Sequence, residues 1–254
     1  MDLGLKGKNA IITGSTRGIG RAIAECLAAE GVNVAIGARD GEATAQAGKE
    51  IAEQHGVKVF AQPCNVKDAD AYKAWLEAAI EDLGGLDIFV PNVSGGGGMD
   101  SEKNWWRNFE IDVLHTVRGA ETCLPALKAS GAGSIVIIGS TNAVETFMGP
   151  MAYNAMKAAL VTYSKQLSQF VAAKGVRVNT VSPGPIYFEG GAWEMIKGTM
   201  PKVYEGTLKQ IPAGRMGTPE EVARVVTFLA SPAASLVTGI NLVADNGFTK
   251  RVQL

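Results

Sequence analysis

The sequence predicts a single α/β domain, residues 1–254, built on a parallel, doubly wound sheet with helices on both faces. Short apolar runs alternate with longer amphipathic segments along the whole chain. Several of those segments end in glycine, as helices commonly do. No composition shift or Pro/Ser-rich linker divides the chain, and 46% apolar content is ample for one buried core.

Seven short apolar runs are the strand candidates. The segments between them, such as IGRAIAECLAAEG and KAALVTYSKQLSQFVAAKG, carry apolar residues at three- and four-residue spacing, which predicts amphipathic helices. Strand followed by helix, repeated, predicts a parallel seven-stranded sheet. The strand candidates are residues 9–14, 32–38, 57–64, 86–92, 134–140, 176–184 and 240–247.

Charge and cysteine content exclude several classes of partner and site. The net charge is −1 without a long run of like charge, so no nucleic-acid-binding face is expected. Cys26, Cys64 and Cys123 are odd in number and far apart, and His55 and His115 are the only histidines, which predicts neither a disulfide framework nor a metal site. There is no signal-peptide pattern and no stretch of roughly 18 apolar residues that would span a membrane. A cytoplasmic protein is therefore expected.

A glycine-rich turn follows the first predicted strand and opens the first predicted helix. It reads TGSTRGIG, residues 13–20. Glycines permit a tight turn and let backbone N–H groups approach a pyrophosphate at the helix N-terminus. The alternative is an ordinary strand-to-helix turn, because this glycine spacing arises easily in a chain with 31 glycines.

The stretch YNAMK places Tyr153 four residues before Lys157. Residues i and i+4 of a helix lie on one face about 5–6 Å apart, so both side chains would project the same way. A nearby ammonium favours the phenolate form of a tyrosine, which makes a proton donor and acceptor usable near neutral pH. Alone the pair carries little weight, because about 0.3 such pairs are expected by chance.

Several specific motifs occur together and in order. Besides TGSTRGIG and YNAMK they include Ser140, thirteen residues before Tyr153, NTVSPG at residues 179–184 and the stretch 215–247. With these motifs the chain resembles the short-chain dehydrogenase/reductase family from end to end. The resemblance implies a Rossmann-type fold and a nicotinamide cofactor.

The resemblance also implies a catalytic set. Tyr153 donates a proton to the developing alkoxide while hydride passes to a carbonyl carbon, and in reverse the phenolate takes the alcohol's proton. Lys157 keeps the phenol acidic and holds the nicotinamide ribose, and Ser140 donates a hydrogen bond to the substrate oxygen. The alternative for Ser140 is a strand-end hydroxyl that caps the following turn. The implied cofactor-binding residues are Gly14, Ser15, Thr16, Arg17, Gly18, Ile19, Gly20, Arg39, Asn65, Val66, Asn92, Tyr153, Lys157, Pro183, Gly184 and Ile186.

The largest departure from the family pattern is Asp112 in NFEIDVL, where the family's catalytic tetrad has Asn. The family's Asn places a water that relays protons to the lysine, and Asp112 can still serve in this role. Its negative charge near Lys157 would favour the ammonium form and change the pH dependence of the relay. The alternative is a purely structural hydrogen-bonding group.

Three other positions depart from the family. PNVS, residues 91–94, stands where the family has Asn-Asn-Ala-Gly. Pro91 has no backbone N–H to donate, and Val93 is bulkier than the family's Ala. Only Asn92 carries over. CNV, residues 64–66, stands where the family has Asp-Val near the adenine. Phe188 replaces a Thr that binds the cofactor's carboxamide, so this contact does not carry over.

The cofactor is expected to be NADP(H). In NAD-preferring relatives an acidic residue ends the second strand and binds the ribose hydroxyls, and that place is Ala38 here. Arg39 follows at once and Arg17 lies in the glycine turn, so two guanidiniums can flank a 2′-phosphate. Asp40 competes with this interpretation, because one register slip would place its carboxylate near the ribose.

Residues 185–212 take the place of the family's mobile substrate-covering helices and are expected to form a lid. Their aromatic and Met content suits a small, predominantly apolar carbonyl or alcohol substrate. Phe147 and Met148 have the same character. The alternative is that each side chain simply packs the lid onto the body. The lid residues concerned are Tyr187, Phe188, Trp193, Met195, Met200 and Tyr204.

Two classes of function remain open, an alcohol/ketone oxidoreductase and a non-catalytic dinucleotide-binding sensor. The intact set of Ser140, Tyr153 and Lys157 favours the enzyme. Within that class, a 3-oxoacyl-[acyl-carrier-protein] reductase is the alternative to a reductase of free small ketones. Only Lys128 and Lys174 are candidates for docking an acidic carrier.

The resemblance implies a homotetramer. Apolar faces on residues 105–127 and 158–173 pair between subunits in relatives. The alternative is that the same residues are ordinary core.

Overall fold

The computed structural model describes residues 2–98, 101–147 and 149–252. In this part of the chain, seven strands form one parallel sheet in the order β3-β2-β1-β4-β5-β6-β7. This confirms the predicted fold class. The strand order reverses direction between β1 and β4, which is the point where α/β sheets of this kind bind ligands. The strands are β1 Asn9–Thr13, β2 Asn33–Gly37, β3 Val59–Ala61, β4 Ile88–Val90, β5 Gly133–Ile138, β6 Val176–Pro183 and β7 Asn241–Ala244.

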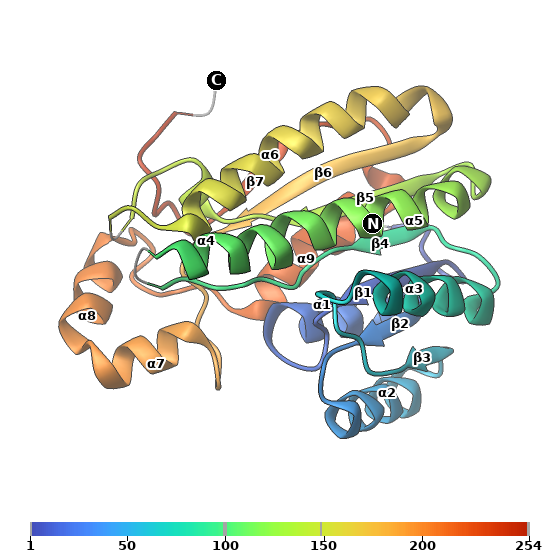
Figure 1. Cartoon of the computed structure of the whole chain (residues 1–254), viewed down its shortest axis with the longest axis horizontal. Coiled ribbons are helices and arrows are strands. Elements are labelled where there is room, and N and C mark those ends of the chain that lie inside the picture. Colours follow the sequence, from blue (N-terminus) through green and yellow to red (C-terminus); the bar gives the residue numbers. More distant parts are fainter. Residues whose placement is uncertain (1, 99–100, 148, 253–254) are drawn as a thin grey trace.

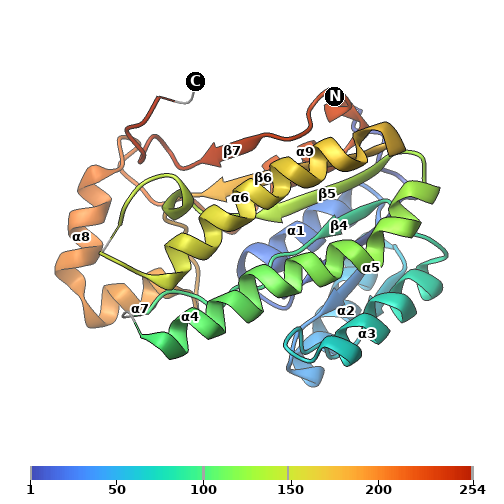
Figure 2. The same ribbon diagram turned by 45° about the horizontal axis from the view of Figure 1, so that its top comes forward.

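Helices cover both faces of the sheet, as Figures 1 and 2 show. α1, α2 and α9 pack on one face, and α3, α5 and α6 pack on the other. Short 3₁₀ turns lie at Thr141–Ala143, Ala172–Lys174 and Pro232–Ala234. The helices are α1 Gly18–Ala29, α2 Gly41–His55, α3 Ala69–Leu83, α4 Glu102–Asn108, α5 His115–Ala129, α6 Ala152–Val171, α7 Ala192–Thr199, α8 Pro201–Gln210 and α9 Pro219–Ala230.

The ends of α2 and α3 carry residues suited to free backbone groups. Asp40 and Asp68 are their N-caps, and each carboxylate accepts a backbone N–H three residues on. Gly56 and Gly84 follow the last turns in the left-handed conformation that glycine adopts without steric cost. These caps explain why the glycine-terminated segments of the sequence are helices.

Successive strand residues enter two different apolar layers. Ile12 and Ile36 pack with α1, α2 and α9, whereas Ile11 and Ile135 pack with α3, α5 and α6. Because side chains alternate across a strand, a sheet covered on both faces needs apolar residues at every position. This is why the strands read as continuous apolar runs.

Several strands are shorter than the apolar runs that predict them. The run at 57–64 yields only β3, Val59–Ala61, which pairs with β2 at the edge of the sheet. The run at 240–247 yields β7, Asn241–Ala244, on the opposite edge. An edge strand has one neighbour, so pairing ends where that neighbour turns away.

A π-helical turn, Phe109–Leu114, interrupts the helix between α4 and α5. The sequence did not predict it. Turns of this kind occur as single bulges inside α-helices, frequently at functional sites. Asp112 lies in this turn and is fully buried.

α7 and α8 extend beyond the two helical layers. Figure 2 shows the arrows of β5, β6 and β7 pointing toward them. They therefore stand at the carboxyl edge of the sheet. The chain reaches them directly from the end of β6, through residues 184–191.

Candidate active site

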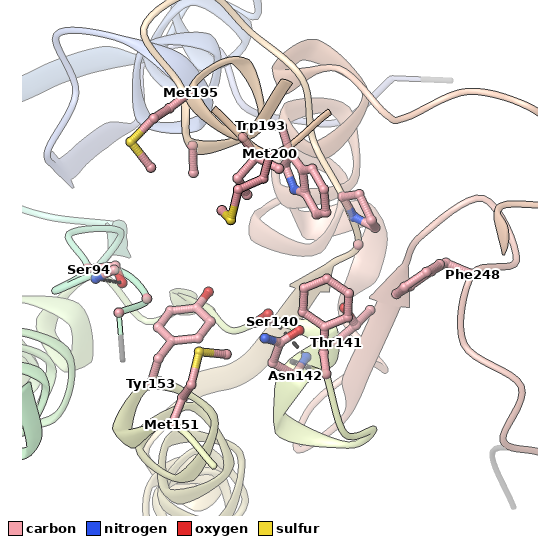
Figure 3. A pocket seen from close by; sticks show the side chains of 18 of the residues that line it. Ser94, Ser140, Thr141, Asn142, Met151, Tyr153, Trp193, Met195, Met200 and Phe248 are labelled. Atoms are coloured by element: carbon pink, nitrogen blue, oxygen red, sulfur yellow. Dashed lines mark hydrogen bonds between the residues drawn. The ribbon is translucent and has the colours of Figure 1, made fainter. Parts of the chain in front are cut away.

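A cavity of about 770 Å³ lies at the carboxyl edge of the sheet, against α7. Its lining comes from the loop after β4, the ends of β5 and β6, the start of α6, α7 and the C-terminal segment, and Figure 3 shows many of these side chains. Most of the lining is apolar, and no charged side chain contributes to it in the described ranges. The polar side chains that line it are Ser94, Ser140, Thr141, Asn142 and Tyr153.

Ser140 follows β5 directly and caps the 3₁₀ turn Thr141–Ala143. Its Oγ accepts the backbone N–H of Asn142 at 3.1 Å. Because the oxygen is the acceptor in this bond, the hydroxyl proton remains available for a second partner. The turn-capping role and the substrate-binding role are therefore compatible, and the cap orients the hydroxyl.

Tyr153 and Lys157 lie one turn apart at the start of α6. The Lys157 Nζ is 5.7 Å from the centroid of the Tyr153 ring, so the two side chains share a face as their spacing predicts. Tyr153 is half-buried and lines the cavity (Figure 3), whereas Lys157 is buried. A phenol is thus exposed to the cavity with a cation behind it.

Lys157 is held between a carbonyl and a carboxylate. Its Nζ donates to the carbonyl oxygen of Ile138 at 2.9 Å and lies 3.1 Å from Asp112 Oδ1. Within the described ranges Oδ1 accepts no well-aligned hydrogen bond, so this contact is an ion pair. Asp112 Oδ2 accepts the backbone N–H of Gly95 at 2.9 Å. Asp112 therefore carries charge next to Lys157 and also fixes the glycine-rich loop.

His115 links the π turn to the glycine turn. Its Nδ1 is 2.9 Å from the Ile111 carbonyl oxygen, and its Nε2 is 3.0 Å from Thr13 Oγ1, which accepts the Asn92 N–H at 3.1 Å. A carbonyl only accepts, so Nδ1 carries the proton and Nε2 accepts from the Thr13 hydroxyl. Burial lowers the pKa of His115 to about 4, against the opposing effects of the Ile111 bond and of Asp112. His115 is therefore a neutral structural link at pH 7.

The turn from β1 to α1 requires its glycines. Gly14 and Gly18 have φ of 67° and 57°, which favours glycine. A Cβ at Gly20 would collide with the carbonyl oxygen of Gly14. Thr16 and Ile19 complete the turn and are half-buried.

The N-terminus of α1 fits the pyrophosphate of a dinucleotide. Its N-cap, Arg17, makes no side-chain cap, and its first turn holds no acidic residue. By contrast, α2 and α3 are capped by carboxylates. The N–H groups of the first turn of α1 are thus left for an anion, which the helix dipole also favours.

Two of the predicted cofactor residues brace this turn from inside. Asn92 Nδ2 donates to the Gly14 carbonyl oxygen at 3.1 Å. Ser15 Oγ donates to the Ile12 carbonyl oxygen at 2.8 Å and accepts the Gly37 N–H at 3.1 Å. Asn92 Nδ2 and the Ser15 hydroxyl are thus bonded within the protein and shape the turn.

The two predicted phosphate-binding arginines follow adjacent strands. Arg39 is exposed and forms no ion pair within the described ranges. Arg17 Nη1 donates to the carbonyl oxygen of Gly190 at 3.1 Å. The carboxylate of Asp40 accepts the Ala43 N–H at 3.0 Å and caps α2. The Asp40 side chain is therefore already hydrogen-bonded as the N-cap of α2.

The remaining predicted cofactor residues lie along the same edge. Asn65 is exposed and Val66 is buried, both just after β3. Pro183 ends β6, Gly184 lines the cavity, and Ile186 is buried just beyond it. The predicted adenosine residues thus lie after β1 to β3. Ser140, Tyr153 and Lys157 lie after β5, and Asp112 lies between β4 and β5.

The lid stretch divides into residues that line the cavity and residues that brace it. Trp193, Met195 and Met200 line the cavity (Figure 3). Tyr187 and Tyr204 do not line it and pack against each other, with ring centroids 6.2 Å apart. Residues 185–212 therefore include side chains that line the cavity and side chains that pack on one another.

Phe188 packs against the glycine turn. A Cβ added at Gly18 would lie 2.6 Å from its ring. The ring thus closes the space between the lid stretch and the start of α1. Phe147 lines the cavity, and Met148 lies outside the described residues.

Several lining residues were missed by the sequence analysis. Asn142 follows the Ser140 motif directly, so its proximity to the site was a usable signal. Met151 lies two residues before Tyr153 and offered the same signal. Phe248 lies 108 residues after Ser140 and directly follows the stretch 215–247, which carries part of the family resemblance, but nothing in that stretch placed it near Ser140.

Lys128 and Lys174 lie at the edge of the sheet opposite the cavity. Lys128 is in the last turn of α5, just before β5, and Lys174 just precedes β6. Both are therefore at the amino ends of strands, whereas the cavity is at the carboxyl ends. A carrier docked on these lysines would not face the cavity.

Other kinds of site find no support in the described ranges. No group of three or more His, Cys, Asp and Glu is placed there to hold a metal ion. Cys64 and Cys123 are buried, Cys26 is half-buried, and all three are free thiols. Among the described helices, none has the length and apolar content to cross a membrane.

Curated proteins with similar sequences are reductases and dehydrogenases. Isoepoxydon dehydrogenase patN of Penicillium expansum is 36% identical over 96% of this chain and 95% of its own length. The 3-oxoacyl-[acyl-carrier-protein] reductase FabG of Vibrio cholerae is 36% identical over 96% of this chain and 98% of its own length. A family model described as Enoyl-(Acyl carrier protein) reductase matches residues 14–249.

Solved structures with the same fold also include a reductase and a dehydrogenase. L-Sorbose reductase from Gluconobacter frateurii, complexed with NADPH and L-sorbose, has a TM-score of 0.91 at 32% identity and covers 99% of this chain and 100% of its own. A putative short-chain alcohol dehydrogenase from Sinorhizobium meliloti has a TM-score of 0.90 at 29% identity, with 98% of both chains covered. Sequence motifs, sheet order and whole-chain similarity therefore lead to one conclusion: the chain belongs to the short-chain dehydrogenase/reductase family of oxidoreductases.

Proposed function

We propose that this protein is an NADP(H)-dependent oxidoreductase that interconverts a ketone and a secondary alcohol. One observation carries the proposal. Ser140 and Tyr153 both line the same apolar cavity, and the buried ammonium of Lys157 lies behind the phenol. A hydrogen-bond donor, a proton donor and a cation are thus arranged around one place where a carbonyl oxygen can bind.

The residues divide the chemistry between them. Ser140 donates its free hydroxyl proton to the carbonyl oxygen and polarises it. Tyr153 donates a proton to that oxygen as negative charge develops, and Lys157 stabilises the phenolate that remains. A nicotinamide bound at this edge would supply the hydride. Asp112 balances the charge of Lys157 and orients it through their 3.1 Å contact.

NADP(H) is the proposed cofactor because of the charges after β1 and β2. Arg17 follows β1 and Arg39 follows β2, and Ala38 supplies no carboxylate for ribose hydroxyls. Asp40 caps α2, which leaves it unsuited to the ribose. The structurally similar L-sorbose reductase is described as complexed with NADPH, which supports the same choice.

The proposed substrate is a small, uncharged and predominantly apolar carbonyl compound or alcohol. We propose that α7 and α8, within residues 185–212, form the lid over it. The apolar lining supports this choice, and so does the absence of a charged side chain among the lining residues described. A 3-oxoacyl-[acyl-carrier-protein] reductase is the second candidate, favoured by the 36% identity to FabG of Vibrio cholerae. The placement of Lys128 and Lys174 away from the cavity argues against it.

We also propose a cytoplasmic homotetramer that binds neither membranes nor nucleic acids. Exposed apolar side chains support the assembly: Trp106 and Phe170 are 61% and 66% exposed on α4 and α6. Large exposed apolar side chains that gather on helices mark interaction surfaces. They belong to the two segments that the sequence predicts to pair between subunits.

Turnover distinguishes the enzyme from a dinucleotide-binding sensor. NADPH oxidation is followed with a panel of uncharged cyclic and aryl ketones and with a 3-oxoacyl thioester. Steady oxidation with a free ketone supports the proposal. Tight NADPH binding without oxidation by any member of the panel would establish a sensor, and a strong preference for the thioester would establish the carrier-protein reductase.

A further inference from the structure

The C-terminal strap, residues 245–252, brings Phe248 to the cavity. Asp245 Oδ2 accepts the backbone N–H of Thr249 at 2.7 Å, which closes a tight turn around Phe248. Asp245 also packs against Gly184, where an added Cβ would lie 2.6 Å from the Asp245 Cβ. The strap is therefore anchored to the end of β6, and Phe248 is held at a defined place beside the cavity.

The strap is also joined to the loop that follows Ser140. The backbone N–H of Lys250 donates to Glu145 Oε2 at 3.0 Å. Phe147, in the same loop, has its ring centroid 6.3 Å from that of Phe248 and 6.0 Å from that of Trp193 in α7. Pairs at this separation and tilt attract each other beyond simple burial. Three distant segments thus contribute to one aromatic wall, formed by Phe147, Trp193 and Phe248.

The aromatic wall and the catalytic groups lie on different parts of the cavity surface. Figure 3 shows Tyr153 and Phe248 on opposite sides of Ser140 and Thr141. All three wall residues line the cavity. A substrate whose carbonyl reaches Ser140 and Tyr153 can extend along the cavity, past Ser140 and Thr141, to this wall.

We propose that the aromatic wall, through Phe248 in particular, determines substrate choice by binding an uncharged aromatic or alicyclic ring next to the reacting carbonyl. The inference rests on the proposed function. Rings bury large apolar areas against aromatic faces. A carboxylate or phosphate at the same place would be desolvated without a cation among the described lining residues, which is costly.

The test compares cyclohexanone, 4-phenylcyclohexanone and 4-oxocyclohexanecarboxylate as substrates, with NADPH saturating. The variants are Phe248→Ala, Phe248→Leu and, as control in the same strap, Val252→Ala, whose side chain is 75% exposed. In the parent we expect kcat/KM to be highest for 4-phenylcyclohexanone and lowest for the carboxylate. In Phe248→Ala we expect the preference for the phenyl compound over cyclohexanone to fall about tenfold, mainly through KM, because a buried aromatic contact is lost. Phe248→Leu should restore part of it, and Val252→Ala should match the parent.

Binding is measured in parallel, by titrating 4-phenylcyclohexanone into the complex with NADP⁺ in place of NADPH. We expect at least about fivefold weaker binding in Phe248→Ala than in the parent, from the same loss of contact. An unchanged preference and unchanged binding in Phe248→Ala would overturn the inference, as would a parent that prefers the carboxylate. If the ketone binds through Phe248 but is never reduced, the wall stands and the proposed function fails.

Discussion

Asp112 Oδ1 lies 3.1 Å from Lys157 Nζ, and the two side chains are 0% and 3% exposed. A buried ammonium without a counter-charge is strongly unfavourable, and a buried carboxylate is equally so. The pair therefore holds two charges inside the protein that neither residue could keep alone. Lys157 is the cation next to Tyr153. The charge of Asp112 therefore acts on Tyr153, the proposed proton donor, indirectly through Lys157.

Asp112→Asn is expected to leave an active enzyme with a displaced pH profile. Asn can still accept the Gly95 N–H, but it removes the negative charge that lies 3.1 Å from the Lys157 ammonium. We therefore expect kcat/KM to decline at lower pH than in the parent on the alkaline side. Glu110→Gln is the control, because Glu110 lies in the same π turn and pairs with Lys67 at the surface. If the pH profile of kcat/KM is identical to the parent's, Asp112 has only a structural role.

Tyr153→Phe is expected to lower kcat by at least about a hundredfold, the contribution typical of a general acid. The change deletes one hydroxyl and its proton and leaves the glycine turn untouched, so NADPH affinity should persist. Steady-state kinetics measure kcat, and fluorescence titration with NADPH measures the cofactor affinity. Tyr163→Phe in the same helix is the matched control. Activity above about a hundredth of the parent's would contradict the proton-donor role.

The cofactor choice is tested by comparing NADPH and NADH at equal concentration. We expect kcat/KM to favour NADPH at least about tenfold, which needs only about 1.4 kcal/mol from a charge-assisted phosphate contact. The double substitution Ala38→Asp/Arg39→Leu should remove this preference, because it adds a ribose-binding carboxylate and deletes one guanidinium. A parent that prefers NADH would refute the assignment. So would a double variant that keeps its NADPH preference.

The homotetramer is tested by light scattering at micromolar concentration. We expect a mass about four times the 26.6 kDa of the chain. Substitution of the exposed Trp106 and Phe170 by Ser should then lower the mass, because it removes apolar area from the surfaces that pair. A mass equal to one chain in the parent would reject the assembly.

His115 is expected to make the protein less stable as the pH falls from about 6.5 to about 4. Its pKa in the folded protein is lowered by burial to about 4, below the value of about 6.5 in an unfolded chain. The unfolded state therefore binds more protons in this window, and the free energy of unfolding falls by about 2 kcal/mol between pH 7 and pH 5. His115→Gln should lose this part of the pH dependence in denaturant titrations. His55→Gln, at the end of α2, should retain it.

The position of His115 illustrates where the sequence stops being informative. Its neighbours in the chain are ordinary helix residues, and nothing in their spacing marks a π turn. The contacts that define its role join Thr13 in β1 and Ile111 one turn earlier in the same segment. Phe248 is a similar case, because its ring partner, Phe147, comes from the loop after β5. Contacts between distant segments leave no periodic trace.

The residues of this chain determine, without further help, a parallel sheet with helices on both faces, a glycine turn after β1 and a Tyr153–Lys157 pair on one helical face. Each of these follows from local rules: side-chain period, the backbone freedom of glycine and the pitch of a helix. The sequence placed the charge of Asp112 near Lys157 only through the family resemblance. Tertiary structure decided that the two form a buried ion pair, that Asp40 is a cap and that Phe248 lines the cavity. The physical reason is that burial and counter-charge depend on which segments meet at the carboxyl edge of the sheet, and that is set by packing over the whole chain.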